Sequence, residues 1–290
     1  QPLRHVRHAV GEPLRTVAIA FALHGLARLA KPLPVADKAV CTLRGIDADF
    51  GFKLHGADCT LTATIGGLTG DRGLALQGAG EVGCAMRPDR VERLAVLAAP
   101  PTTTADQIAL NSVQLEAIRI DPRFAGGDYY DAADGEGPHR GLALARRMAL
   151  LNYRSPTELN LRFQRSWQSG VSPLGGGGRF AVESYLDFHG NKFTRRFDAN
   201  SYLTLVEAMN SHDVGRGRGG VEDALAQVTA RTLVLGIDSD RLFPVDGQER
   251  IFRGIRSTID DDTVVLSSDF GHDGFLIETA AVGAHLRRLL

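Results

Sequence analysis

The sequence lacks the features that mark several large protein classes. Its 290 residues carry 33 lysines and arginines against 34 aspartates and glutamates, so the formal net charge is −1. Nucleic acids and anionic membranes attract a net basic surface, so this balance argues against both as partners. The longest apolar run, Val17 to Leu23, is much shorter than the roughly 20 residues that a membrane-spanning helix needs. We therefore expect a globular protein with no nucleic-acid or membrane partner.

Cysteine is scarce, and its spacing argues against two further classes. The three cysteines, Cys41, Cys59 and Cys84, form no C-x-x-C pair. An odd number without that spacing favours neither a disulfide framework nor a zinc site, and we expect no metal centre. No basic and then apolar leader opens the sequence, so we expect a protein of the reducing cytoplasm.

Short apolar runs, aliphatic or β-branched on both faces, predict a sheet. They lie at Thr16–Leu23, Leu61–Ile65, Leu94–Ala98, Thr232–Ile237 and Thr263–Leu266. Such runs are typical of a parallel sheet that is covered on both sides. Segments with helical periodicity separate several of them, and this alternation favours an α/β layer architecture.

Between Leu97 and Thr232 the pattern becomes helical, without a clear strand. Helices are predicted at Ala105–Asp121, Gly141–Tyr153, Ser155–Ser166 and Ser201–Ser211. The simplest organisation is a helical lobe inserted between two strands of the sheet. The predicted core is then residues 1–103 and 212–290, and the lobe is residues 104–211.

Three segments could carry chemistry, and their order along the chain is informative. The run that ends at Ile65 leads into Gly66-Gly67-Leu68-Thr69-Gly70. A nucleophile elbow has this pattern: a strand is followed by G-x-x-x-G and then by a helix. Asp240 follows a later strand, and His272 follows the last one. Nucleophile, acid and histidine is the chain order of α/β-hydrolase triads. Each signal alone is weak: an aspartate after a strand is usually a turn or cap residue, and Asp238 with Asp240 also imitates a magnesium site.

The later part of the chain resembles the homoserine O-acetyltransferase family, in particular its actinobacterial members. The resemblance extends from about Asn111 to Leu290, and before Pro100 it is patchy. The sequence motifs on which the resemblance rests are Gly126-Gly127-Asp128-Tyr129-Tyr130, Gly141-Leu142-Ala143-Leu144-Ala145-Arg146, Asn152-Tyr153-Arg154-Ser155, Glu183-Ser184-Tyr185-Leu186, Arg196-Phe197-Asp198-Ala199-Asn200-Ser201-Tyr202, Ser211-His212-Asp213-Val214-Gly215-Arg216-Gly217, Ser239-Asp240-Arg241-Leu242-Phe243-Pro244 and Gly271-His272-Asp273-Gly274-Phe275-Leu276.

The resemblance implies an α/β-hydrolase core, a mostly parallel sheet with helices on both faces, and an inserted helical lid. It implies transfer of an acetyl group from acetyl-CoA to the homoserine hydroxyl through an acyl-enzyme, a step of methionine biosynthesis. Acetyl-CoA is then a co-substrate, with no bound cofactor, and the family pairs as homodimers through the lid. The family's triad acid falls on Asp240 and its triad histidine on His272.

Residues that contact homoserine in the family fall on Arg146, Tyr153 and Asp273. Arg146 and Tyr153 are seven residues apart, so a helix places them on one face. A guanidinium offers two donors to the substrate carboxylate, and Asp273 could accept from its ammonium group. Without the resemblance, Arg146 would be read as a solvated helix charge and Tyr153 as a packing aromatic.

The predicted elbow departs from the family pattern. The family has Gly-Gly-Ser-Met-Gly-Gly, and Leu68 stands at the serine position of this sequence. An alkyl side chain cannot form an acyl-enzyme, so we expect little or no turnover, although the backbone N–H groups of Leu23 and Thr69 would be oxyanion donors if the turn is kept. The alternatives are a non-catalytic protein that retains the homoserine pocket and an ester hydrolase, which needs the same nucleophile. Either the first third has diverged in a relative without activity, or the sequence is altered there.

Overall fold

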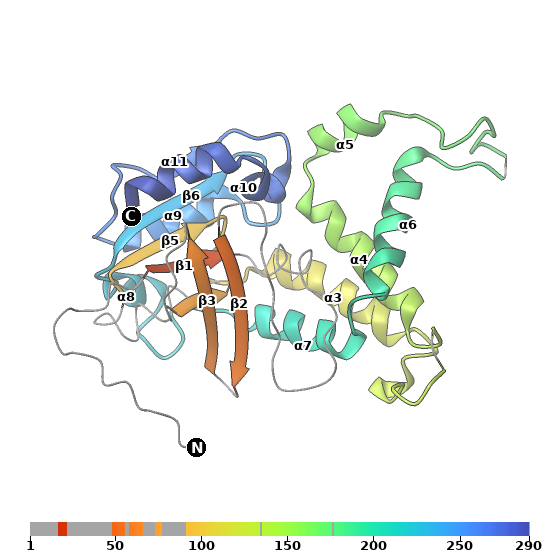
Figure 1. Cartoon of the computed structure of the whole chain (residues 1–290), viewed down its shortest axis with the longest axis horizontal. Coiled ribbons are helices and arrows are strands. Elements are labelled where there is room, and N and C mark those ends of the chain that lie inside the picture. Colours follow the sequence, from red (N-terminus) through yellow and green to blue (C-terminus); the bar gives the residue numbers. More distant parts are fainter. Residues whose placement is uncertain are drawn as a thin grey trace, which may run out of the picture.

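The computed structural model describes residues 91–133, 135–175 and 177–289 with their side chains (Figure 1). Of the first 90 residues it describes the backbone of four strands: β1 (Val17–Phe21), β2 (Ala48–His55), β3 (Asp58–Ile65) and β4 (Gly73–Leu76). Among the described helices, none is long and apolar enough to span a membrane. Within the same part of the chain, no three His, Cys, Asp or Glu side chains are grouped as metal ligands would be.

The strands form one sheet in the order β2-β3-β4-β1-β5-β6-β7, where β5 is Arg93–Leu97, β6 is Arg231–Ile237 and β7 is Val264–Leu266. From β4 to β7 all neighbours are parallel. All five predicted runs overlap a strand, and the mostly parallel α/β sheet is confirmed. β2, β3 and β4 pair antiparallel, so β3 runs opposite to β5 and β6.

Helices cover both faces of the β5–β6 part of the sheet (Figure 1). Alternate side chains of these strands, Leu94, Val96 and Val234, join one buried cluster with α8 (Val221–Ala226) and α9 (Val245–Gly254). The C-terminal helix α11 (Thr279–Leu289) lies on the other side of β6 from α9 (Figure 1). The two layers bury both faces of the strands, which explains why the strand sequences are apolar throughout.

The chain between β5 and α8 forms helices that extend to one side of the sheet (Figure 1). They are α3 (Ala105–Arg119), the short 3-10 helix η1 (Ala125–Gly127), α4 (His139–Tyr153), α5 (Pro156–Phe163), α6 (Ala181–Thr194) and α7 (Ala199–Asn210). Side-chain caps set several of their starts: Thr104 accepts from the Gln107 N–H, and Asp198 from the Ser201 N–H. The lobe boundaries at 104 and 211 stay a prediction.

A buried cluster joins these inserted helices to the sheet. It contains Leu150 and Tyr153 at the end of α4, and Leu242 and Phe243 from the loop after β6. The end of α4 is therefore packed against the segment that follows Asp240. This contact places the inserted helices over the carboxyl ends of β6 and β7, where the candidate site lies.

Candidate active site

Asp240 is fixed by the loop that follows β6. Its Oδ1 accepts hydrogen bonds from the backbone N–H groups of Leu242 and Phe243, at 2.8 and 2.9 Å. A carboxylate that accepts two backbone donors is held in one orientation, and its other oxygen is free to point elsewhere. That second oxygen, Oδ2, points to the loop after β7.

His272 lies in the short helix η2 (Gly271–Asp273), which follows β7. Its Nδ1 is 2.7 Å from Asp240 Oδ2, and neither side chain has any exposed surface. Because a carboxylate only accepts, Nδ1 carries the proton and Nε2 is left as the basic nitrogen. Among the described residues Nε2 has no hydrogen-bond partner, although it is buried. An oriented imidazole with an unused basic nitrogen is suited to general-base chemistry.

Further hydrogen bonds join the acid loop to the histidine loop. Asp238 Oδ1 accepts from the Ser268 N–H at 3.0 Å, and Ser239 Oγ donates to the Ser268 carbonyl. Ser239 Oγ also accepts from the Gly271 N–H at 3.0 Å. Asp238 and Ser239 thus hold the two loops in register, a role that nothing in the sequence pattern distinguished from an ordinary turn.

Aromatic rings enclose the imidazole. The rings of Phe243 and Phe275 meet it edge-on, with centroids 5.1 and 5.2 Å away, and the Tyr153 ring centroid is 6.3 Å away. These side chains keep water from the His272–Asp240 pair and lower the local dielectric, which strengthens their interaction.

Arg146 is buried on α4, close to Tyr153. Its Nη1 is 3.5 Å from the Tyr153 hydroxyl, and its guanidinium lies over the rings of Tyr153 and Phe193, 5.1 and 4.9 Å from their centroids. Only 3% of Arg146 is exposed, yet no carboxylate of the described residues forms an ion pair with it. Burial raises the pKa of the nearby Tyr202 phenol, so that group stays neutral and offers no negative charge either.

Asp273 is also buried, directly after His272, and Arg154 lies beside it. Asp273 Oδ2 is 3.3 Å from Arg154 Nε. Arg154 Nη1 in turn donates to both carboxylate oxygens of Glu158, at 3.0 and 3.2 Å. The sequence singled out Asp273 but missed Arg154 and Glu158, because an arginine at the end of a helix is usually solvated.

The strand that leads into the predicted elbow, β3, does not end beside Asp240 and His272. β3 is antiparallel to β4, which is parallel to β1, β5 and the strands beyond. β3 therefore ends at the opposite end of the sheet from Asp240 and His272. On the side of β5 away from β6 lies β1, which pairs with β5 in parallel and ends at Phe21, opposite Leu97. Leu68, Thr69 and Leu23 lie outside the described residues.

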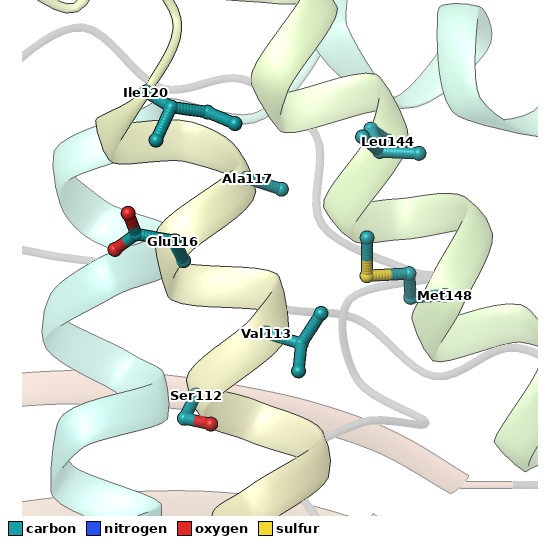
Figure 2. Close-up of a pocket in the computed structure, with 7 residues that line it drawn as sticks. All are labelled: Ser112, Val113, Glu116, Ala117, Ile120, Leu144 and Met148. Carbon is teal, nitrogen blue, oxygen red and sulfur yellow. The ribbon is translucent and has the colours of Figure 1, made fainter.

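A cavity of about 470 Å³ lies elsewhere, between α3 and α4 (Figure 2). Its lining is mostly apolar: Ser112, Val113, Glu116, Ala117, Ile120, Leu144 and Met148. It contains none of the predicted site residues, so it is not the site described above.

Comparison with known proteins decides the relationship. No family model matches the chain. A homoserine O-acetyltransferase of Clavibacter michiganensis subsp. michiganensis is 71% identical over 204 residues, which is 70% of this chain and 52% of that protein. This chain is related to the homoserine O-acetyltransferases. One from Leifsonia xyli subsp. xyli is 72% identical over 203 residues, 70% of this chain and 50% of that one. The chain thus spans about half the length of the curated relatives it matches.

Comparison with solved structures supports the fold. The crystal structure of a homoserine O-acetyltransferase from Bacillus anthracis superimposes with a TM-score of 0.64 at 22% identity, and covers 74% of this chain and 59% of that one. The relationship to homoserine O-acetyltransferases and the α/β-hydrolase fold, both expected from the sequence, are confirmed.

Proposed function

We propose that this chain carries the acid–base pair and the acceptor pocket of a homoserine O-acetyltransferase site, with acetyl-CoA as the acyl donor and the homoserine hydroxyl as the acceptor. The observation that carries the proposal is the buried Asp240–His272 hydrogen bond, which leaves Nε2 basic and without a partner among the described residues. In such a site Nε2 takes the proton of the attacking hydroxyl, and Asp240 stabilises the imidazolium that forms.

The charges around the imidazole support an amino-acid acceptor. The buried Arg146 guanidinium contacts Tyr153, whose ring centroid is 6.3 Å from that of His272, and it can bind a carboxylate through two parallel hydrogen bonds. Asp273 follows His272 directly, in a buried group with Arg154 and Glu158 that contains two carboxylates and one guanidinium. A cation that reaches a neighbour of His272 and a carboxylate next to it fit the carboxylate and ammonium groups of homoserine.

The lack of a nucleophilic side chain at position 68 limits the activity that we propose. Leu68 has no nucleophilic atom, and β3, which precedes it, runs away from His272. We therefore expect that the chain binds homoserine but transfers acetyl groups slowly or not at all. A non-catalytic homoserine-binding protein is the second candidate function, and Leu68 is the observation that favours it.

Release of CoA from acetyl-CoA, followed with a thiol reagent in the presence and absence of homoserine, tests the acyl transfer. Release that depends on homoserine and is abolished by His272→Ala supports the acetyltransferase. Release that survives His272→Ala contradicts the role of the imidazole, and release that needs only water indicates a hydrolase. Leu68→Ser is expected to add no turnover, because the preceding strand leads to the wrong end of the sheet.

Calorimetric titration with homoserine tests the acceptor pocket separately. Binding without CoA release supports the non-catalytic candidate, whereas no binding at all contradicts the acceptor pocket. Norvaline, in which a methyl group replaces the hydroxyl of homoserine, separates recognition of the amino-acid part from recognition of the hydroxyl.

We further propose pairing of two chains through the inserted helices, and a location in the cytoplasm, where acyl-CoA donors are available. The outer surfaces of α5 and α6 and the segment between them expose large apolar side chains: Leu161 at 68%, Leu174 at 74% and Phe188 at 60%. Such exposure is typical of a surface that is covered in an assembly. Sedimentation of Phe188→Asp should show dissociation, whereas Val265→Asp, at a 46% exposed position of β7 outside the inserted helices, should leave the oligomeric state unchanged.

A further inference from the structure

The link between α4 and α5 is packed tightly against the histidine loop. Ser155 is the N-cap of α5, and its Oγ accepts from the Glu158 N–H at 3.0 Å. The same Oγ donates to the carbonyl of Asp269, three residues before His272. Gly271 has a φ of +65°, and a Cβ there would lie 2.6 Å from the Ser155 nitrogen. The backbones are therefore in direct contact, and only glycine fits at this point of the loop.

Arg154 supplies the side-chain part of this contact. It lies in extended backbone between the end of α4 and the cap of α5, so its position is fixed on both sides. Its Nη1 donates to Glu158, and its Nε is 3.3 Å from Asp273 Oδ2. Arg154, Glu158 and Asp273 have exposed fractions of 7%, 7% and 1%. One buried guanidinium thus lies between a carboxylate of the inserted helices and a carboxylate of the histidine loop.

Stability alone is a weak reason for such a group. Removing three charged groups from water is costly, and well-packed apolar side chains often stabilise a protein as much or more. The geometry has a second consequence. Asp273 is bonded covalently to His272 within one 3-10 turn, so whatever fixes the Asp273 carboxylate also limits the orientation of the imidazole.

We propose that Arg154 is a positioning residue: its guanidinium holds Asp273, and through it the turn that carries His272, against the end of α4. The inserted helices then set the direction of Nε2 as well as covering it. The same contact orients Asp273 toward a substrate ammonium group, and this second effect rests on the proposed function.

The test compares three variants of the whole chain with ¹⁵N-histidine labels. The Nδ1–H proton of His272, assigned by its loss in His272→Gln, reports the hydrogen bond to Asp240. We expect this proton to exchange with solvent at least about tenfold faster in Arg154→Gln. Arg162→Gln is the matched control. Arg162 also approaches Glu158, at 3.6 Å, but its side chain is 49% exposed. In Arg162→Gln the exchange rate of the His272 proton should stay within about twofold of that in the parent chain.

Arg154→Lys separates positioning from stability, and it also covers the case in which Arg154→Gln does not fold. Lysine keeps the charge but lacks the planar fork that reaches two carboxylates. We expect a melting temperature close to that of the parent chain and exchange of the His272 proton that is still clearly faster. Unchanged exchange in a folded Arg154→Gln or Arg154→Lys would overturn the proposal.

Homoserine titration of the same variants tests the second effect. Affinity should fall at least about tenfold in Arg154→Gln and stay unchanged in Arg162→Gln. If the parent chain binds no homoserine, the proposed function fails, while the exchange experiment still decides the positioning role. If the parent binds and Arg154→Gln binds equally well, the orientation of Asp273 by Arg154 is wrong.

Discussion

Arg146 and Arg154 belong to the same stretch of chain and are both buried, but their surroundings are opposite. Arg146 lies over the rings of Tyr153 and Phe193 and forms no ion pair with a carboxylate of the described residues. Arg154 lies between the carboxylates of Glu158 and Asp273. A buried cation that the fold itself compensates serves the fold, whereas one left without a counter-ion indicates a place for an anion.

The two arginines should differ most in how much each contributes to the free energy of unfolding. Arg154→Ala leaves two buried carboxylates without the cation between them, so we expect a loss of about 3–5 kcal/mol. Arg146→Met removes a buried charge and keeps most of the packing volume, so its effect should stay within about 1 kcal/mol. Urea unfolding of both variants at pH 7.5 measures the difference. Equal losses would mean that Arg146 also has a structural counter-ion.

Substitution of Arg146, which should affect stability little, should strongly weaken homoserine binding. If homoserine binds as proposed, Arg146→Met leaves its carboxylate beside the Tyr153 and Phe193 rings without a cation, so we expect an affinity loss of about 100-fold, or about 2.7 kcal/mol. Calorimetry on the folded variant measures it, and homoserine lactone, which lacks the carboxylate, is the control ligand. Arg146→Met binding homoserine as well as the parent chain does would place the carboxylate elsewhere.

The contact that gives Arg154 its structural role can be disturbed without touching a charge. Gly271→Ala puts a Cβ against the backbone of Tyr153, Arg154 and Ser155, in a backbone conformation that alanine adopts with strain. We expect a loss of at least about 2 kcal/mol in unfolding free energy. Gly283→Ala is the control: in α11 the nearest atom to a new Cβ is the flexible end of Arg287, at 3.5 Å. That substitution should stabilise by about 0.5–1 kcal/mol. A harmless Gly271→Ala would show that the two loops are not held together.

The sequence was sufficient for the parts of the site that depend on local pattern. Asp240 and His272 each follow an apolar strand, and such positions meet at one end of a parallel sheet. The direction of β3 could not be read in the same way, because an apolar run does not specify whether its partner is parallel or antiparallel. Helix α6 was missed for another reason. Gly190 weakens its helical pattern, but a Cβ there would lie 2.8 Å from the Ala143 carbonyl of α4.

The sequence does not show which arginine is buried or which carboxylates lie beside it. Nothing near Arg154 distinguishes it from Arg147, whose side chain is 38% exposed and pairs with Asp187. The partner Asp273 is more than 100 residues away along the chain, so only the fold brings the two charges together. Buried ion pairs between distant segments are set by tertiary packing, and local propensity carries little information about them.

His212 titrates outside the arginine sites, and its protonation changes the stability against which the arginine variants are compared. His212 is partly buried where the inserted helices return to the sheet, and its Nε2 is 3.1 Å from the Pro100 carbonyl. Burial lowers the pKa of His212 below its usual 6.5, a shift opposed by the hydrogen bond to Pro100 and by Asp213 and reinforced by Arg216. As the pH falls below 6.5, the unfolded chain therefore binds a proton that the folded chain still excludes, and stability decreases.

Well above pH 6.5 His212 is neutral in both states, and its contribution to the pH dependence becomes small. We expect His212→Gln, which keeps an N–H donor for the Pro100 carbonyl, to reduce the loss of unfolding free energy between pH 7.5 and pH 5. The difference between variant and parent across this interval isolates His212 from the carboxylates, which titrate in both chains. If the two profiles run parallel, His212 takes up its proton as readily in the folded chain as in the unfolded one.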